Sequence, residues 1–460
     1  RCYLAIIYEG YLPAHVRQLV GPNRRNGGNR MRRPWLATVA CVIGLGLIVQ
    51  ANMAQAGLED ILYEKGELTK EEWIRAKADN EKTTAEQDKA LDQKFFIKGS
   101  YDKKKGLVFK SNDGNFAMEL GLRFQLRYSY PQEGDSLNAA SQSSFDDKDV
   151  SSFRVRRARL KMGGHAFQPW LKYYFEYDVP SNTLLDWRVD FAKFKWATLR
   201  MGQWKVNYNR ERVDSSGAQQ FADRSIVNSP FTLDRQTGVM LSGAFFESTP
   251  AYIIYNVGVF TGIGLNQSHN DDKRMLYVAR LQWNFLGRDL PFSQSDTEYT
   301  ELPTASLAFA AAHNRADRFT FPTTSRAAGV VDGQFRINQA VQEIAFKYRG
   351  FSLQQEFHVK EVNNTSTQTK TNLLGAYVQA GYFPHYMIDF IPQPLEIAFR
   401  YAFVDPNDTN RNDVLREQTV ALNWFFEGHR HKLTLDASHL SQAGKDTPED
   451  RIRLQYDISF

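Results

Sequence analysis

Alternation of apolar and polar residues over long stretches is the feature that most constrains the fold of this chain. Between residues 117 and 130 an apolar side chain stands at almost every second position, and Glu, Gln and Arg fill most of the positions between. The stretches 351–360 and 451–460 repeat the pattern, with Gln355 as the one exception. Because successive side chains of a strand point to opposite faces of a sheet, the pattern predicts strands with one apolar and one polar face.

Sixteen segments carry this pattern over all or part of their length. They are 115–130, 150–165, 170–179, 186–196, 198–205, 236–246, 251–261, 274–285, 304–313, 335–348, 351–362, 372–382, 395–404, 416–426, 431–441 and 449–460. Connections after odd-numbered segments include the long stretches 131–149, 206–235, 314–334 and 405–415. Those after even-numbered segments are often very short, although 286–303 and 383–394 break the rule.

An even number of strands, alternating long and short connections and 13% aromatic residues together favour a membrane-spanning barrel. A sheet in lipid must close on itself, because lipid offers no partner to an open edge. The alternative, a secreted β-sandwich, has shorter strands and turns its apolar faces inward. We therefore expect an all-β fold, a 16-stranded antiparallel transmembrane β-barrel with a short N-terminal helical periplasmic segment, in the bacterial outer membrane.

The N-terminal region has the features of a targeting segment. The apolar run 35–49 has 15 residues, fewer than a membrane-spanning helix needs, and it follows Met31, Arg32 and Arg33 and precedes an A-x-A site at 54–56. We expect residues 1–30 to be upstream translation, 31–56 a signal peptide, 57–114 a periplasmic helical lead-in and connector, and 115–460 the barrel. Residues 1–56 hold both cysteines, seven Arg and one Glu, so the net charge of +5 becomes about −1 for residues 57–460.

The lead-in contains one clear helix signal. Thr69 and Glu72 have the spacing of a capping box, and residues 70–77 are good helix formers. The apolar stripe is thin, however, and a flexible linker is the alternative.

Motifs of enzymes are missing from the sequence. It has no G-x-S-x-G, no H-E-x-x-H, no Walker A motif and no C-x-x-C. We therefore expect no catalytic residue, no metal and no cofactor. Nucleic acid is excluded as a partner by the expected location in the outer membrane.

One predicted strand is strongly basic. In 153–162, Arg154 and Arg156 alternate with apolar residues, and Arg157, Arg159 and Lys161 do so in the opposite phase. A β-bulge between Arg156 and Arg157 would place all five cations on one face. Charge facing lipid costs about 2–4 kcal/mol at the midplane, so that face is the lumen. The five cations either meet permeating anions or pair with Glu119, Glu176 and Asp178 to brace the wall.

Several motifs resemble the phosphate-selective porin family (porin O and P type) of Gram-negative outer membranes. They lie in 153–178, 200–205, 223–225 and 234–239, with a further similar stretch at 61–69. The resemblance implies a homotrimeric sixteen-stranded channel in outer-membrane lipid, in which the third external loop, 206–235, folds inward and narrows the pore. It also implies passive diffusion of small anions such as phosphate, selected by lumenal arginines and by lysines near the constriction.

The candidate pore residues are all basic. They are Arg123, Arg127, Arg154, Arg156, Arg157, Arg159, Lys161, Lys205, Arg210, Arg212 and Arg224. The third loop differs from the lysine-rich constriction of the family, because its four arginines are balanced by the four acids Glu211, Asp214, Asp223 and Asp234. The alternatives are a weakly selective general porin and a barrel without a transport role, such as an adhesin or a hydrolase.

Overall fold

The structure is a computed structural model. It describes residues 62–63, 65–94, 97–103, 105–131, 151–267, 270, 272–317, 333–444 and 449–460. The expected upstream segment 1–30 and signal peptide 31–56 lie outside the described residues. The chain divides into two compact units, 1–91 and 92–460, which are described separately.

Helix α3 (Lys70–Lys94) dominates the first unit. The predicted capping box is confirmed at its start: the backbone N of Thr69 donates to Glu72 Oε2 over 2.9 Å, and the backbone N of Glu72 donates to Thr69 Oγ1 over 3.4 Å. These bonds satisfy amide groups that the first helical turn leaves without partners. Among the described residues, no helix is long and apolar enough to cross a membrane.

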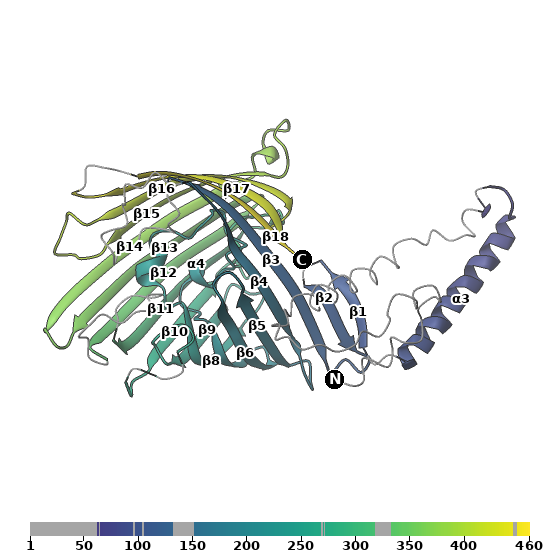
Figure 1. Ribbon diagram of the computed structural model, residues 1–460, viewed down its shortest axis with the longest axis horizontal. Coiled ribbons are helices and arrows are strands. Elements are labelled where there is room, and N and C mark those ends of the chain that lie inside the picture. The colour runs from purple at the N-terminus through teal and green to yellow at the C-terminus, as the bar shows by residue number, and fades with distance from the viewer. Residues whose placement is uncertain are drawn as a thin grey trace, which may run out of the picture. The chain divides into compact units, whose positions relative to one another are not determined.

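The second unit is a closed antiparallel barrel of sixteen strands (Figure 1). They are β3 (Ala117–Tyr130), β4 (Ser152–His165), β5 (Leu171–Asp178), β6 (Thr183–Phe194), β7 (Ala197–Lys205), β8 (Arg235–Phe245), β9 (Tyr252–Phe260), β10 (Leu276–Asn284), β11 (Thr304–Ala316), β12 (Phe335–Tyr348), β13 (Phe351–Asn364), β14 (Thr369–Tyr382), β15 (Leu395–Asp405), β16 (Leu415–Glu427), β17 (His431–Gln442) and β18 (Glu449–Ser459). Each strand pairs with its neighbour in sequence, and β18 pairs with β3 from Ile452↔Tyr130 to Ser459↔Arg123. The sixteen predicted strands and the closed barrel are confirmed.

A hairpin that the sequence analysis did not anticipate precedes the barrel. Strands β1 (Ile97–Asp102) and β2 (Gly106–Ser111) pair with each other, and β2 continues the sheet onto the first residues of β3. The sheet therefore begins ahead of residue 115.

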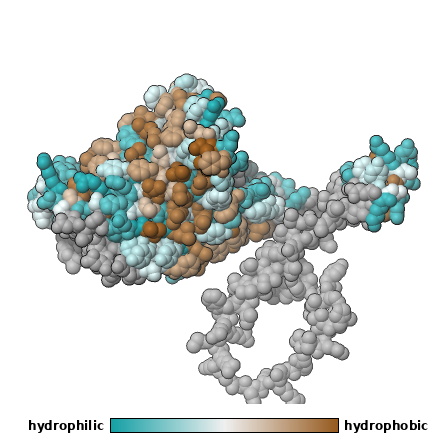
Figure 2. All heavy atoms as spheres, turned by 90° about the horizontal axis from the view of Figure 1, so that it is seen from above, coloured by the Kyte–Doolittle hydropathy of each residue, from teal (hydrophilic) through white to brown (hydrophobic). Residues whose placement is uncertain are grey.

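The alternation in the strands sorts side chains between two environments. Apolar residues at outward positions are solvent-accessible over about half their surface, for example Phe309 (55%) and Leu281 (50%). Figure 2 shows such residues gathered over one face of the barrel. A water-soluble protein would bury them, whereas a membrane protein turns them toward lipid.

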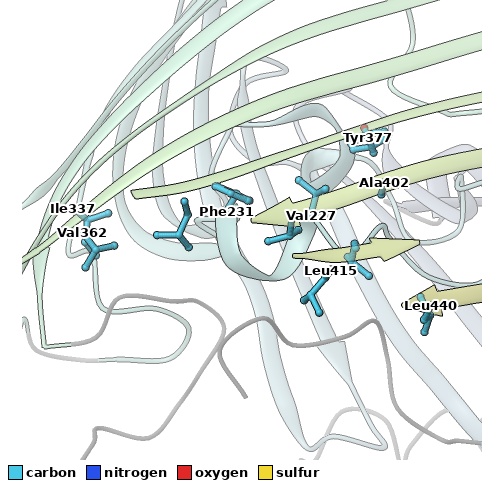
Figure 3. Packing of buried hydrophobic residues seen from close by; sticks show 11 residues of the cluster. Val227, Phe231, Ile337, Val362, Tyr377, Ala402, Leu415 and Leu440 are labelled. Atoms are coloured by element: carbon cyan, nitrogen blue, oxygen red, sulfur yellow. The ribbon is translucent and has the colours of Figure 1, made fainter. Parts of the chain in front are cut away.

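The polar positions face the barrel interior, where the long connection 206–234 between β7 and β8 is packed. This connection, called loop 206–234 below, contains the short helices α4 (Arg210–Val213) and α5 (Asn228–Phe231). Val227 and Phe231 belong to a buried apolar cluster with Ile337 and Val362 of the wall (Figure 3). Such packing fixes the loop against the strands opposite β4–β7.

Candidate functional site

The basic strand β4 carries the predicted bulge. Gln125 of β3 pairs with Arg157, and the next residue, Leu126, pairs with Val155, so Arg156 is the extra residue. Phe153 and Val155 are 74% and 46% exposed on the lipid side. The bulge resets the phase of the strand, and the five cations of β4 therefore lie on its lumenal side.

The cations of β4 differ in their partners. Arg159 donates from Nη1 to Glu176 Oε1 over 2.7 Å and from Nε to Asp178 Oδ2 over 3.2 Å. The wall-bracing interpretation therefore holds for Arg159. Glu119 instead pairs with Lys105, with 2.6 Å between Nζ and Oε1.

Arg157 and Lys161 lack such a partner within the described part of the chain. Arg157 is buried and donates to the neutral amide of Gln125, and no carboxylate of the described residues forms an ion pair with it. Lys161 is half-buried and forms neither a hydrogen bond nor an ion pair there. These two residues contribute the least compensated positive charge of β4.

Strands β5–β7 extend the charged wall with residues that the sequence analysis missed. Arg200 donates from Nε to Asp190 Oδ1 over 2.7 Å and from Nη2 to Oδ2 over 2.9 Å. Arg188 lies 3.4 Å from Asp186, between Nη1 and Oδ2. The alternation of charged with apolar residues in 186–191 was the signal that could have found them.

Positive charge predominates on the lumenal side of β4–β7. Apart from Lys205 of β7, whose Nζ is bonded to loop 206–234, the cations are the eight residues Arg154, Arg156, Arg157, Arg159, Lys161, Lys172, Arg188 and Arg200. The four carboxylates are Glu176, Asp178, Asp186 and Asp190.

Loop 206–234 is bonded to the opposite part of the wall, beginning at β12 and β13. The backbone N of Arg210 donates to Glu343 Oε1 over 3.1 Å. Asn209 Nδ2 and the backbone N of Glu211 donate to the two carboxylate oxygens of Glu356, over 3.0 and 2.6 Å. The N-terminal part of the loop is therefore held by two wall carboxylates.

The contacts continue around the barrel to β16 and β17. The backbone N of Ala222 donates to Asp436 Oδ2 and that of Ile226 to Glu417 Oε2, both over 2.9 Å. The same two carboxylates also pair with arginines of the wall, Asp436 with Arg453 and Glu417 with Arg400, so the loop amides complete their hydrogen bonding.

Exposure divides the lumenal wall into two parts. Under the loop, the side chains of Arg400 and Asp436 are 1% and 0% exposed. On β6 and β7, the side chains of Arg188 and Arg200 are 21% and 25% exposed. Water therefore reaches the interior along β6 and β7, and the basic strand β4 lies on the same side of the barrel.

The remaining candidate residues hold structure together. Arg123 pairs with Asp457, Arg127 with Asp223, and Arg212 with Asp234. Lys205 Nζ and Arg224 Nη2 each donate to the backbone O of Asp214 over 2.8 Å. Arg210 Nε donates to Gln354 Oε1 over 3.2 Å. All of these except Lys205 and Arg212 are buried.

Burial shifts the titration of the loop carboxyls. Burial, and after it the neighbouring carboxylate of Glu356, raises the pKa of Glu211 to about 7. Burial also raises the pKa of Asp214 to about 6, although Lys205 and Arg224 oppose it. For Asp234 the effect of burial is outweighed by Arg212 and Arg235, which lower its pKa to about 2.

The closed barrel with an apolar exterior and a charged, water-accessible interior defines an outer-membrane channel. The family model of phosphate-selective porin O and P matches residues 136–458. The chain belongs to this porin family, as its motifs suggested. Family and fold indicate a channel rather than an enzyme.

Solved structures of low sequence identity are similar to this chain. A loop L8 deletion mutant of OmpT, an outer membrane protein of Vibrio cholerae, is 8% identical, with a TM-score of 0.50 over 75% of this chain and 100% of that one. The anion-selective porin from Comamonas acidovorans is 11% identical, with a TM-score of 0.46 over 75% and 100%. Salmonella typhi OmpF in complex with daunomycin is 11% identical, with a TM-score of 0.48 over 75% and 98%. No curated protein matches the chain.

Proposed function

We propose that this porin is a passive channel for small anions, including phosphate-class oxyanions, and that their path follows β4–β7. The observation that carries the proposal is the excess of cations on this part of the lumenal wall, eight against four carboxylates. Cationic side chains around water replace part of the hydration of an anion and lower its barrier to entry. Loop 206–234, bonded to the opposite wall, narrows the path to the basic side.

Arg157 and Lys161 have the largest role in this proposal. A guanidinium paired with a carboxylate, like that of Arg159, presents little net charge to a passing ion. Arg157 and Lys161 lack such pairing in the described chain, so their fields act on the lumen.

The proposal also covers export of the chain and its assembly in the outer membrane. Residues 31–56 direct export, 57–114 form a periplasmic segment, and 115–460 insert into outer-membrane lipid as a homotrimer. The motifs shared with the porin family and the A-x-A site at 54–56 support this arrangement.

The test is the reversal potential of purified protein in a planar bilayer under a KCl gradient. We expect stepwise channels that pass chloride more readily than potassium, and more so at low salt. A reversal potential near zero would favour the weakly selective general porin, which the four wall carboxylates support. The absence of stepwise channels would favour an adhesin or another role without transport.

A further inference from the structure

The connection 383–394 between β14 and β15 is one of the two that break the rule of short connections at its end of the barrel. Its middle carries apolar side chains that no other described part of the protein covers. Met387 is 79% exposed, Phe390 88% and Ile388 43%. In Figure 1 the connection projects, in light green, beyond the ends of the neighbouring strands. Residues 387–390, called the tip below, therefore stand clear of the barrel wall.

The tip is held by a folded base. The ring of Phe383 is buried, with its centroid 5.5 Å from that of Phe425 at the end of β16. The 3-10 turn η2 (Pro384–Tyr386) follows, and the ring of Tyr386 lies 4.4 Å from that of Tyr299 in the adjacent connection. These contacts fix the start of the connection on the barrel, so the exposed tip has a defined place at its rim.

The surroundings of the tip are those of a membrane interface. Other connections and strand ends at the same end of the barrel carry exposed aromatic side chains, namely Phe167, Trp196, Phe246 and Phe426. Ile397, near the start of β15, is exposed on the outer wall. Aromatic girdles mark the two boundaries between lipid and water in membrane-spanning barrels. The tip therefore continues a surface that faces lipid.

The size and charge of the tip also favour lipid over a protein partner. Each side of a stable protein–protein interface contributes roughly 20 residues or more, whereas the tip offers three apolar side chains. A lipid interface accepts single apolar side chains, because no complementary shape is needed. Asp389 is exposed between Ile388 and Phe390, and its charge limits the depth, since a carboxylate within the hydrocarbon is costly.

We propose that the tip is a lipid anchor that inserts Met387, Ile388 and Phe390 into the phospholipid leaflet at this end of the barrel. In the orientation of the proposed channel, this is the periplasmic leaflet. The apolar side chains lie about 5–10 Å within the boundary between headgroups and acyl chains, and Asp389 stays among the headgroups. The inference goes beyond the proposed function, because it concerns the lipid around the protein rather than the permeating ion.

The experiment measures the depth of a nitroxide spin label at position 390 in phosphatidylcholine vesicles. Residues 57–460 contain no cysteine, so F390C introduces a single labelling site there, and wild type treated with the same reagent gives the background. The label collides with oxygen, which concentrates in hydrocarbon, or with a nickel chelate, which stays in water. Labels at F309C on the lipid-facing wall and at T367C in the exposed turn between β13 and β14, at the opposite end, are the references.

We expect the label at F390C to prefer oxygen, as at F309C, and to lie about 5–10 Å below the headgroups. M387C places a label at a second position of the tip and should show the same preference, so the result does not depend on one variant. Labels at both positions that collide mainly with the nickel chelate, as at T367C, would lie in water and overturn the anchor. Labels that neither probe reaches would be covered by protein, and a neighbouring copy of the chain would replace lipid as the partner. A cation-selective wild-type channel would overturn the proposed function and leave the anchor standing.

Discussion

Arg123 of β3 and Asp457 of β18 form a buried ion pair across the seam that closes the barrel. Arg123 Nε lies 2.9 Å from Asp457 Oδ1, and Nη2 lies 2.5 Å from Oδ2. Both side chains are 1% exposed. The first and last barrel strands, more than three hundred residues apart in the chain, are therefore joined by charge as well as by backbone hydrogen bonds.

We predict that D457N weakens this closure. The substitution leaves the Arg123 guanidinium buried without its counter-charge, which costs about 3 kcal/mol or more. The loss should appear as a lower denaturation midpoint of the folded barrel in detergent. E119Q is the control, because it disturbs the more exposed Lys105–Glu119 pair, whose loss costs at most about 1 kcal/mol. Equal effects of the two substitutions would refute a special role for the seam pair.

The strands could be predicted because lipid imposes one rule on every strand. Outward positions must be apolar, so a period of two runs through each of the sixteen strands. Strands β1 and β2 escaped prediction because they have only six residues each, and the six residues of β1 are all exposed. Strands of six residues are too short to show a clear alternation.

The candidate site was predictable only in part. The cations of β4 are visible in the sequence as one basic run, and the phase change marks the bulge. Their pairing was not visible, because it depends on the register between strands and on contacts such as Asp223 with Arg453, 230 residues apart. Sequence alone could not separate Arg159, which is paired, from Arg157 and Lys161.

We predict that the stability of the protein falls as pH rises through about 7, because of Glu211. Its pKa is raised above the unfolded value, so the folded state holds the extra proton and loses that advantage as Glu211 ionises. The effect amounts to at most about 3 kcal/mol. The measurement is the denaturation midpoint in detergent at pH 5.5 and pH 8.5.

Variants separate Glu211 from other groups. E211Q should reduce the difference between the two pH values, because an amide does not titrate. E247Q changes an exposed carboxylate that pairs with Lys195, and it should retain the wild-type difference. An unchanged pH dependence in E211Q would assign the effect to another residue.

Deleting residues 214–223 should raise single-channel conductance. This part of loop 206–234 includes Gln220 and Asp223, which bond to β15, β3 and β18, so its removal widens the interior while the wall strands remain. A shorter deletion of about four residues within 406–414, the connection between β15 and β16, is the control and should leave conductance unchanged. If neither deletion changes conductance, loop 206–234 does not limit the flow of ions.

The last prediction separates the two interpretations of the basic strand. The double variant R157Q/K161Q removes two cations that have no carboxylate ion pair in the described structure, whereas R159Q/E176Q removes an ion pair and leaves the net charge unchanged. In a KCl gradient, R157Q/K161Q should move the reversal potential toward cation preference, and R157E/K161E should move it further. R159Q/E176Q should remain near wild type. The differences should be larger at 0.1 M salt than at 1 M, because the Debye length falls from about 10 Å to about 3 Å. If R157Q/K161Q left the reversal potential unchanged, Arg157 and Lys161 would be wall residues without a part in selectivity, and the anion preference would need another source.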